Sequence, residues 1–316
     1  MNESENISTI RAEAASRHEL WLLGQPPLHK FLDFVDDQGV VEQISNAQLL
    51  VDQWRAANDY YEELAKNEAG IADMIECSGL DRRLQPLAEE VMADARYRRT
   101  FDTLPARIAM VELDRLVVCQ NHVTYNFVED LKSRLGPHPD PEALFRFCLP
   151  LDTPQTPVEI RKVGSQRYVF RCDSTDFRFH ESVLLHPDQI VGHEAHGALA
   201  GVVGLMVGHS SNFLNAIHDD DSNRLLLNNG YHRACALREL GITHAPCLVQ
   251  TVTRRDELDI TAKPIVSENP GYYFNAPRPP VLKDFGNPRI RKMIPVKKVV
   301  RMIEISFEVD DHLIHA

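Results

Sequence analysis

The sequence has no closely spaced cysteine pair and no long hydrophobic run. Its six cysteines are far apart, at positions 77, 119, 148, 172, 235 and 247, which excludes a zinc-ribbon spacing and a dense disulfide framework. No stretch approaches the ~18 to 20 consecutive apolar residues that cross a bilayer, and the first residues, MNESENISTI, lack the pattern of a signal peptide. We therefore expect a cytoplasmic protein with no membrane partner.

The sequence also has fewer basic than acidic residues. The chain has 34 Lys and Arg against 46 Asp and Glu, a formal charge of −12. This sign opposes the counterion release on which non-specific nucleic-acid binding depends, so DNA binding is unlikely. The length of 316 residues, with 43% hydrophobic and 25% charged residues, is that of a folded chain with a substantial core and about two domains of ~150 residues.

Residues 1–105 carry most of the negative charge and are predicted to form a helical N-terminal region. Apolar residues recur at helical spacing over 46–68 and again over 84–95. Ser45 with Gln48 predicts a capping box for the first helix, and Gly70 its end. The charged residues are most simply the solvated faces of these helices.

Strand and turn signals begin after residue 105. We predict a strand from 108, a helix over 128–135, a Pro-rich connection over 137–157 and a hairpin of 158–163 with 167–172. The glycine-spaced apolar run 197–208 is predicted to be a buried helix. The Pro-rich tail 263–316 should wrap around the domain and end in a strand, 301–309. Its basic residues between 283 and 301 are expected to offset the acidic N-terminal region, with a phosphate-binding patch as the alternative.

The most informative segment is 224–250, RLLLNNGYHRACALRELGITHAPCLVQ. It predicts a strand, a tight turn at Gly230, a helix over 231–240 and a second strand. The unpaired amides at the start of that helix favour an anion, and the Arg233 guanidinium matches two phosphate oxygens. The alternative is an ordinary Asn-Gly turn, with Arg233 paired to a surface carboxylate.

Asn229-Gly230-Tyr231-His232-Arg233-x-x-Ala236-Leu237, followed by Leu240-Gly241 and Pro246, resembles the G-x-H-R-x-x-A…G…P signature of the ParB/sulfiredoxin-like superfamily. The resemblance covers roughly 106–140 and 212–252, leaves 141–211 as an insertion and does not extend to residues 1–105. It implies an α+β fold with a small mixed sheet in a domain spanning 106–262. It also implies a nucleotide, ATP, ADP or CTP, bound by Asn229, Gly230, Tyr231, His232 and Arg233.

The chain departs from each named branch of that superfamily. Tyr231 stands where sulfiredoxins have a reactive cysteine, and Gln120 stands near where serine kinases often have a carboxylate. A Pro-rich tail follows the box, where partition proteins have a helix-turn-helix. Glu112, Asp114 and His232 are the candidate catalytic residues, with Glu129, Asp130 and His122 as weaker ones. Asp220 and Asp221 are candidates to hold a Mg²⁺ ion that the phosphates carry.

These residues favour a nucleotide-binding enzyme that transfers or hydrolyses a phosphoryl group, with a small molecule as the second substrate. One alternative is a non-catalytic, nucleotide-responsive binding or scaffold protein. A homodimer is one candidate assembly for this chain. A second alternative is a metal-dependent enzyme that uses the histidines at 180, 186, 193, 196, 209 and 218.

Overall fold

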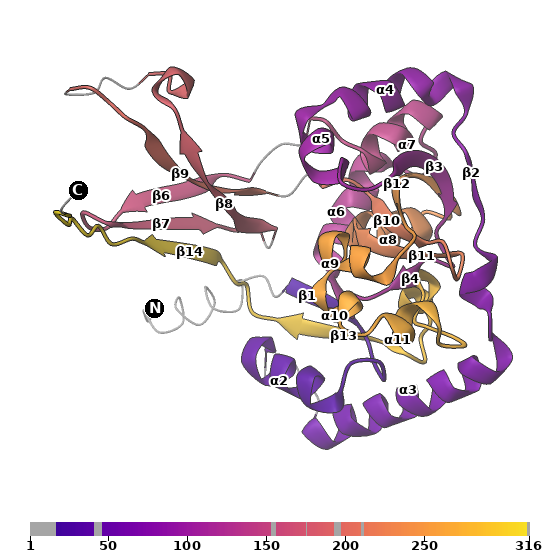
Figure 1. The fold of residues 1–316 in the computed structure, drawn as a ribbon. Helices are drawn as coiled ribbons and strands as arrows, with labels where there is room; N and C mark the ends of the chain where they lie inside the picture. The colour runs from indigo at the N-terminus through magenta and orange to yellow at the C-terminus, as the bar shows by residue number, and fades with distance from the viewer. Residues whose placement is uncertain are drawn as a thin grey trace, which may run out of the picture. The chain divides into compact units, whose positions relative to one another are not determined.

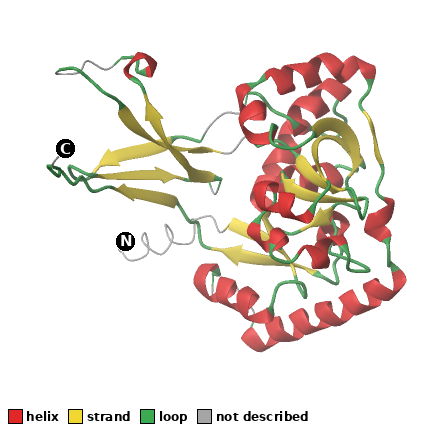
Figure 2. Cartoon of the chain, viewed as in Figure 1, coloured by secondary structure: helices red, strands yellow, loops and turns green. Residues whose placement is uncertain are grey.

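The computed structural model describes residues 17–40, 46–152, 156–174, 176–192, 197–209 and 212–314. They form a mixture of helices and several β-sheets, as Figure 1 and Figure 2 show, so the predicted α+β class is confirmed. The chain divides into two compact units. Unit 1 takes residues 1–152 and 211–298, and unit 2 takes residues 153–210 and 299–316. These divisions differ from the expected boundaries at 105 and 262, because the N-terminal helices and most of the tail share unit 1 with the central strands.

Two N-terminal helices form where the apolar periodicity predicted them, α3 (Ala47–Asn67) and α4 (Gln85–Ala93). Two more, α2 (Leu28–Gln38) and α5 (Ala95–Phe101), were not predicted from that periodicity. The Asn46 side chain caps α3 by accepting a hydrogen bond from the Gln48 amide at 2.9 Å, while the predicted cap Ser45 lies outside the described residues. Gly70, at φ +78°, precedes the 3₁₀ turn η2 (Ile71–Met74) instead of ending α3, whose C-cap is Glu68.

Unit 1 contains two sheets. The larger has the order β2 (Cys77–Gly79), β3 (Ala106–Glu112), β12 (His244–Val252), β10 (Asn215–Asp219), β11 (Arg224–Asn229) and β4 (Val117–Val118). Its β10–β12 and β11–β4 pairs are parallel and the other pairs antiparallel. The smaller sheet has the order β13 (Arg291–Val296), β1 (Arg17–Leu22) and β5 (His122–Thr124). Side chains such as Phe145, Phe213 and Phe274 fill the main core around the larger sheet, and a second cluster joins β1 and β13 to α2 and α3.

Three further helices of unit 1 are α6 (Tyr125–Leu135), α7 (Pro141–Cys148) and α8 (Tyr231–Glu239). The prediction of a plain connection over 137–157 is wrong because α7 lies within it. Pro141 there occupies the first turn, where its missing amide costs no hydrogen bond, and Asp140 caps the helix by accepting from the Ala143 amide at 2.8 Å. Short helices α9 (Leu258–Thr261), α10 (Pro264–Ser267) and α11 (Pro270–Phe274) follow β12.

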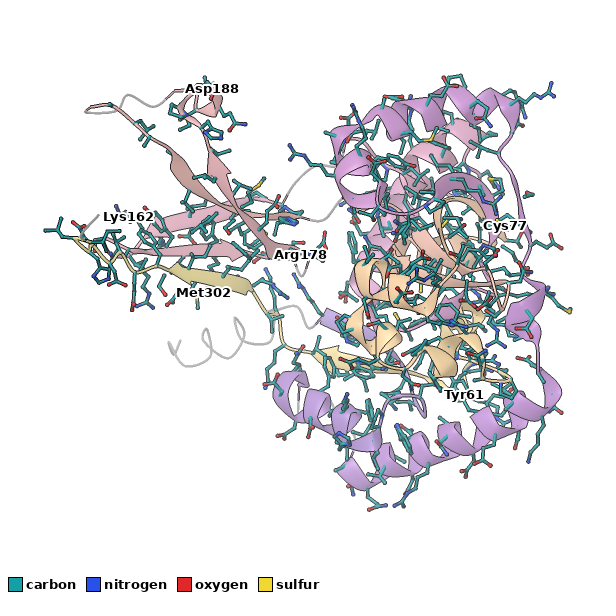
Figure 3. The ribbon with its side chains drawn as sticks, in the orientation of Figure 1. Tyr61, Cys77, Lys162, Arg178, Asp188 and Met302 are labelled. Atoms are coloured by element: carbon teal, nitrogen blue, oxygen red, sulfur yellow. The ribbon has the colours of Figure 1, made fainter. Side chains whose placement is uncertain are left out.

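In its described residues, unit 2 consists of strands and one 3₁₀ turn, η4 (Pro187–Gln189). Its three-stranded sheet has the order β14 (Arg301–Ser306), β7 (Arg167–Cys172) and β6 (Val158–Lys162), and β8 (Phe177–Leu185) pairs with β9 (Val202–His209). Figure 3 labels Lys162, Arg178 and Met302 on β6, β8 and β14. The predicted hairpin is confirmed as β6–β7, and the final strand as β14.

The prediction of a buried helix over 197–208 is wrong, because β9 occupies this segment. Its valines suit a strand, and its glycines allow close approach to β8: a Cβ added at Gly204 would lie 3.1 Å from Val183 Cγ2. Glycines in a hydrophobic run are equally compatible with close helix packing, so the pattern alone did not separate the two structures.

The basic tail of unit 1 pairs with the acidic region around α3, as the charge balance predicts. Arg278 lies between Asp284, at 2.7 Å, and Glu68, at 2.9 Å, and its side chain is fully buried. Lys283 also bonds Glu68, at 2.8 Å, and Tyr61 of α3, labelled in Figure 3, lies 3.5 Å from Asp284 through its hydroxyl. Partial burial raises the pKa of Glu68, but its bonds to Lys283 and Arg278 outweigh that effect and lower the pKa below its ordinary 4.5.

Candidate functional site

The site begins at the turn between β11 and α8. Gly230 has φ +90°, a left-handed conformation that side chains resist, and a Cβ there would lie 2.8 Å from Leu214 Cδ1 and 2.9 Å from Leu214 Cα. A glycine is therefore required both for the turn and for close packing against the residue before β10. Directly after it, the amides of Tyr231, His232 and Arg233 open the nine-residue helix α8. The N-cap residue is a glycine and so offers no capping side chain, and no acidic residue stands in the first turn.

Tyr231 anchors the start of α8 to the sheet. Its side chain is buried, its hydroxyl donates to the Leu227 carbonyl at 2.6 Å, and the same oxygen accepts from the Cys119 amide at 3.0 Å. Burial raises the pKa of this phenol well above its ordinary value. Tyr231 therefore joins α8 to β11 and to the residue after β4, and its side chain faces the core instead of a ligand.

The side chains of His232 and Arg233 contact neighbouring segments of unit 1. His232 Nε2 accepts a hydrogen bond from the Thr124 amide at 3.1 Å. Arg233 is buried, and its Nη1 donates at 2.6 Å to both the carbonyl and the side-chain oxygen of Asn212. Arg233 therefore bonds the loop before β10, and its predicted contact with a phosphate stays a prediction.

Lys263 brings positive charge to the start of α8 and was not predicted from the sequence. Its ammonium lies 4.9 Å from the centre of the Tyr231 ring and 3.5 Å from Gln120 Oε1. Gln120, which follows β4, donates from Nε2 to the His122 carbonyl at 2.7 Å. Lys263 comes from the turn before α10, thirty residues after Arg233 at the end of the G-x-H-R box, so no local spacing in the sequence could have indicated it.

Asparagines on the ends of β10 and β11 extend this polar surface. Asn215 pairs in register with Asn229, directly before Gly230. Asn215 is 3% exposed, and its Oδ1 has no hydrogen-bond partner within the described part of the chain. Asn228 donates to the Thr261 carbonyl at 3.0 Å, which joins β11 to the segment that carries Lys263. A buried carbonyl oxygen without a donor is unfavourable unless a ligand or a water molecule supplies one.

Glu112 and Asp114 lie at the other end of α8. Asp114 bonds Arg238, in the last turn of the helix, at 2.5 Å. Glu112 pairs in register with His244, after the helix, and accepts from the Glu76 amide at 3.2 Å. Nine helical residues at 1.5 Å each span about 13 Å, so the structure does not bring these carboxylates to the first turn. The weaker candidates Glu129 and Asp130 form surface ion pairs on α6.

Asp220 and Asp221 are also distant from Gly230. Both are exposed in the turn between β10 and β11, beside Asp219 and Arg224, which pair in register. Gly230 follows the opposite end of the six-residue strand β11, and at ~3.4 Å per residue the strand separates the two ends by roughly 17 Å. These aspartates therefore cannot hold a cation on phosphates bound at the start of α8.

A carboxylate–histidine pair that the sequence did not predict lies on the smaller sheet. Glu19 of β1 is 8% exposed and bonds His122 Nδ1 of β5 at 2.9 Å. Thr124 Oγ1 donates to the other Glu19 oxygen at 2.7 Å, and the Thr124 amide is the group that bonds His232. A chain of hydrogen bonds thus runs from the Glu19 carboxylate to the first turn of α8.

The predicted histidine cluster divides between the two units. His180, His186 and His209 belong to unit 2 and His218 to unit 1, whereas His193 and His196 lie outside the described residues. His209 Nε2 lies 3.6 Å from Cys172 Sγ, and His218 Nε2 lies 3.2 Å from Asn223 Oδ1. Over the described ranges, no three His, Cys, Asp or Glu side chains group as metal ligands would.

Comparison of the sequence with protein-family models finds no match, and comparisons with curated proteins and with solved structures find no similar chain. Among the helices of the described residues, none combines the length and the apolar character needed to cross a membrane.

Proposed function

We propose that this chain binds a nucleoside di- or triphosphate, ATP, ADP or CTP, through the first turn of α8. The observation that carries the proposal is the left-handed Gly230 immediately before three helix-opening amides, with the Lys263 ammonium over the ring of the first helical residue. Amides at a helix N-terminus and a nearby ammonium both stabilise phosphate oxygens. The resemblance of 229–237 to the ParB/sulfiredoxin-like box supports the same assignment.

The charge around this turn favours an anion. The helix end carries roughly half a positive charge, Lys263 adds a full one, and the first turn has no carboxylate to occupy the amides. In the ParB/sulfiredoxin-like box His232 and Arg233 would contact the phosphates directly. Here both also bond protein groups, so we assign the charge contact to Lys263 and the backbone contacts to residues 231–233.

We further propose that the bound nucleotide donates a phosphoryl group to a small hydroxyl compound or to water. Phosphoryl transfer depends mainly on positioning and charge neutralisation, which amides, an ammonium and a phosphate-bound Mg²⁺ ion supply. The rival is a nucleotide-responsive binding protein without turnover. It is favoured by the placement of Glu112, Asp114, Asp220 and Asp221 away from Gly230, because none of these carboxylates can then serve the phosphates.

Calorimetric titration of the full chain with ATP, ADP and CTP, with and without Mg²⁺, tests the binding proposal. Lys263→Gln should weaken nucleotide binding about tenfold or more, as loss of a charge-assisted contact implies. Lys66→Gln, a change at an exposed lysine of α3, is the matched control and should leave the affinity unchanged. Absence of binding by the wild-type protein, or equal affinities for both variants, would refute the assignment.

Turnover separates the two rival functions. The protein is incubated with Mg²⁺-ATP and a panel of amino acids and other hydroxyl compounds, and released phosphate and phosphorylated products are measured. Product formation identifies an enzyme. Tight nucleotide binding without product, together with a nucleotide-dependent change in oligomeric state, identifies a binding or scaffold protein.

A further inference from the structure

The Glu19–His122 pair has the geometry of a histidine prepared to accept a proton. Glu19 Oε2 lies 2.9 Å from His122 Nδ1, and the Glu19 side chain is only 10% exposed. A buried carboxylate bonded to one ring nitrogen holds the proton there and leaves the other nitrogen as the base. His122 Nε2 has no hydrogen-bond partner in the described part of the chain, and the side chain is 38% exposed.

Three contacts fix the orientation of this pair. The His122 ring stacks on Trp21, with the ring centres 4.5 Å apart and the planes 12° from parallel. Phe34 of α2 lies 5.1 Å from the same ring. Thr124 Oγ1 satisfies the second oxygen of Glu19 at 2.7 Å. The pairing of β1 with β5 explains why Trp21 lies opposite His122. The pairing alone does not explain why a buried carboxylate, Glu19, bonds this partly exposed imidazole.

The pair is tied to the proposed phosphate site through Thr124. The Thr124 amide donates to His232 Nε2 at 3.1 Å, and His232 is the second residue of α8. His122 stands two residues before Thr124 on the same strand, and its side chain lies on the same side of it, because both side chains bond Glu19. Residues two apart on a strand are separated by about 7 Å, so the backbone of His122 lies about that far from the Thr124 amide that bonds His232.

We propose that His122 is the general base of a phosphoryl transfer at this site and that Glu19 is its positioning residue. This inference rests on the proposed nucleotide binding. His122 Nε2 accepts the proton of a hydroxyl compound or of water, and the oxygen forms a bond to the terminal phosphorus of a nucleoside triphosphate. The bond from that phosphorus to the bridging oxygen breaks, and the nucleoside diphosphate leaves with the electron pair. The imidazolium then returns its proton to solvent.

This assignment supplies the base that Gln120 cannot provide. A carboxamide in that position has no basic atom, and its Nε2 is already bonded to the His122 carbonyl. Gln120 therefore holds the backbone of the residue whose side chain performs the proton transfer. Gln120 also accepts from Lys263, so one side chain contacts both the proposed base and the proposed phosphate ligand.

The test compares Mg²⁺-ATP turnover by the full-length wild-type protein with that of His122→Gln, Glu19→Gln and the control His29→Gln, a change at an exposed histidine of α2. Loss of a general base lowers turnover about 10²- to 10⁴-fold, so His122→Gln should fall in that range with an unchanged nucleotide affinity. Glu19→Gln should lose less, and His29→Gln nothing.

A second measurement distinguishes chemistry from a folding defect. Added imidazole should restore part of the turnover of His122→Ala, which a merely structural role would not permit. Wild-type turnover in His122→Gln would overturn the inference. So would nucleotide binding with no turnover toward water or any hydroxyl compound, and in that case the binding proposal would stand. If the wild-type protein binds no nucleotide, both proposals fail.

Discussion

Replacement of Gly230 by alanine tests the geometry from which the site is built. The added Cβ would lie 2.8 Å from Leu214 Cδ1 and 2.9 Å from Leu214 Cα, and the second of these atoms is backbone. The left-handed conformation costs an alanine roughly 1 to 2 kcal/mol, and overpacking of a tight site typically costs a further 1 to 3 kcal/mol. We expect Gly230→Ala to lower the free energy of unfolding by about 2 to 5 kcal/mol.

Gly241→Ala is the matched control. Gly241 has φ +79°, similar to that of Gly230, but an added Cβ there would meet no atom within 4 Å. Its cost should be limited to the conformational part, about 1 to 2 kcal/mol. The difference between the two variants therefore measures the close approach of Leu214 to the turn.

Urea unfolding followed by tryptophan fluorescence is the appropriate assay. The chain has two tryptophans, Trp21 and Trp54, and both lie in unit 1, so the signal reports the unit that contains Gly230. Equal unfolding free energies for Gly230→Ala and Gly241→Ala would refute the packing argument. The requirement for glycine at the start of α8 would then be conformational only.

Three other substitutions test the surrounding contacts. Arg233→Ala should lower the unfolding free energy by about 1.5 to 3 kcal/mol through loss of charge-assisted bonds. In urea unfolding, the double variant with Asn212→Ala should lose less stability than the sum of the two single variants. Tyr231→Phe leaves a buried carbonyl and a buried amide without their hydroxyl partner. The free energy of unfolding should therefore fall by about 1 to 3 kcal/mol, which a lower thermal midpoint would reveal. Glu68 has a lowered pKa in the folded state, so its contribution is present above its ordinary pKa of 4.5 and is lost as pH falls. Glu68→Gln should therefore flatten the acid side of the stability profile relative to the exposed control Glu62→Gln.

Helical periodicity and turn or cap residues in the sequence predicted those helices and strands whose boundaries are set by neighbouring residues. The stripe of Leu50, Ala57, Tyr61 and Leu64 is buried along α3, because helical spacing alone places these residues on one face. The strand–glycine–helix–strand order of 224–250 is confirmed for the same reason: each boundary has its own turn or cap residue. The prediction of a helix over 197–208 was wrong because this segment forms a strand through its pairing with β8, which neighbouring residues do not determine.

The composition of the site depends on strand direction and on distant segments. Asp220 and Asp221 are close to Gly230 in sequence, but a full strand separates them from it. Glu19 and Lys263 are far away in sequence, and sheet pairing and the turn before α10 bring them to unit 1 beside residues 120–124. Spacing could therefore identify the turn and the helix, but not the charged groups around them.

The most direct test of nucleotide binding at α8 is a crystal structure of the protein grown with saturating Mg²⁺-ATP. The account predicts phosphate oxygens about 3 Å from the amide nitrogens of Tyr231, His232 and Arg233, with the Lys263 ammonium in contact with the same phosphates. Phosphates bound at another place, or a first turn of α8 that holds no phosphate while the nucleotide is bound elsewhere, would contradict it.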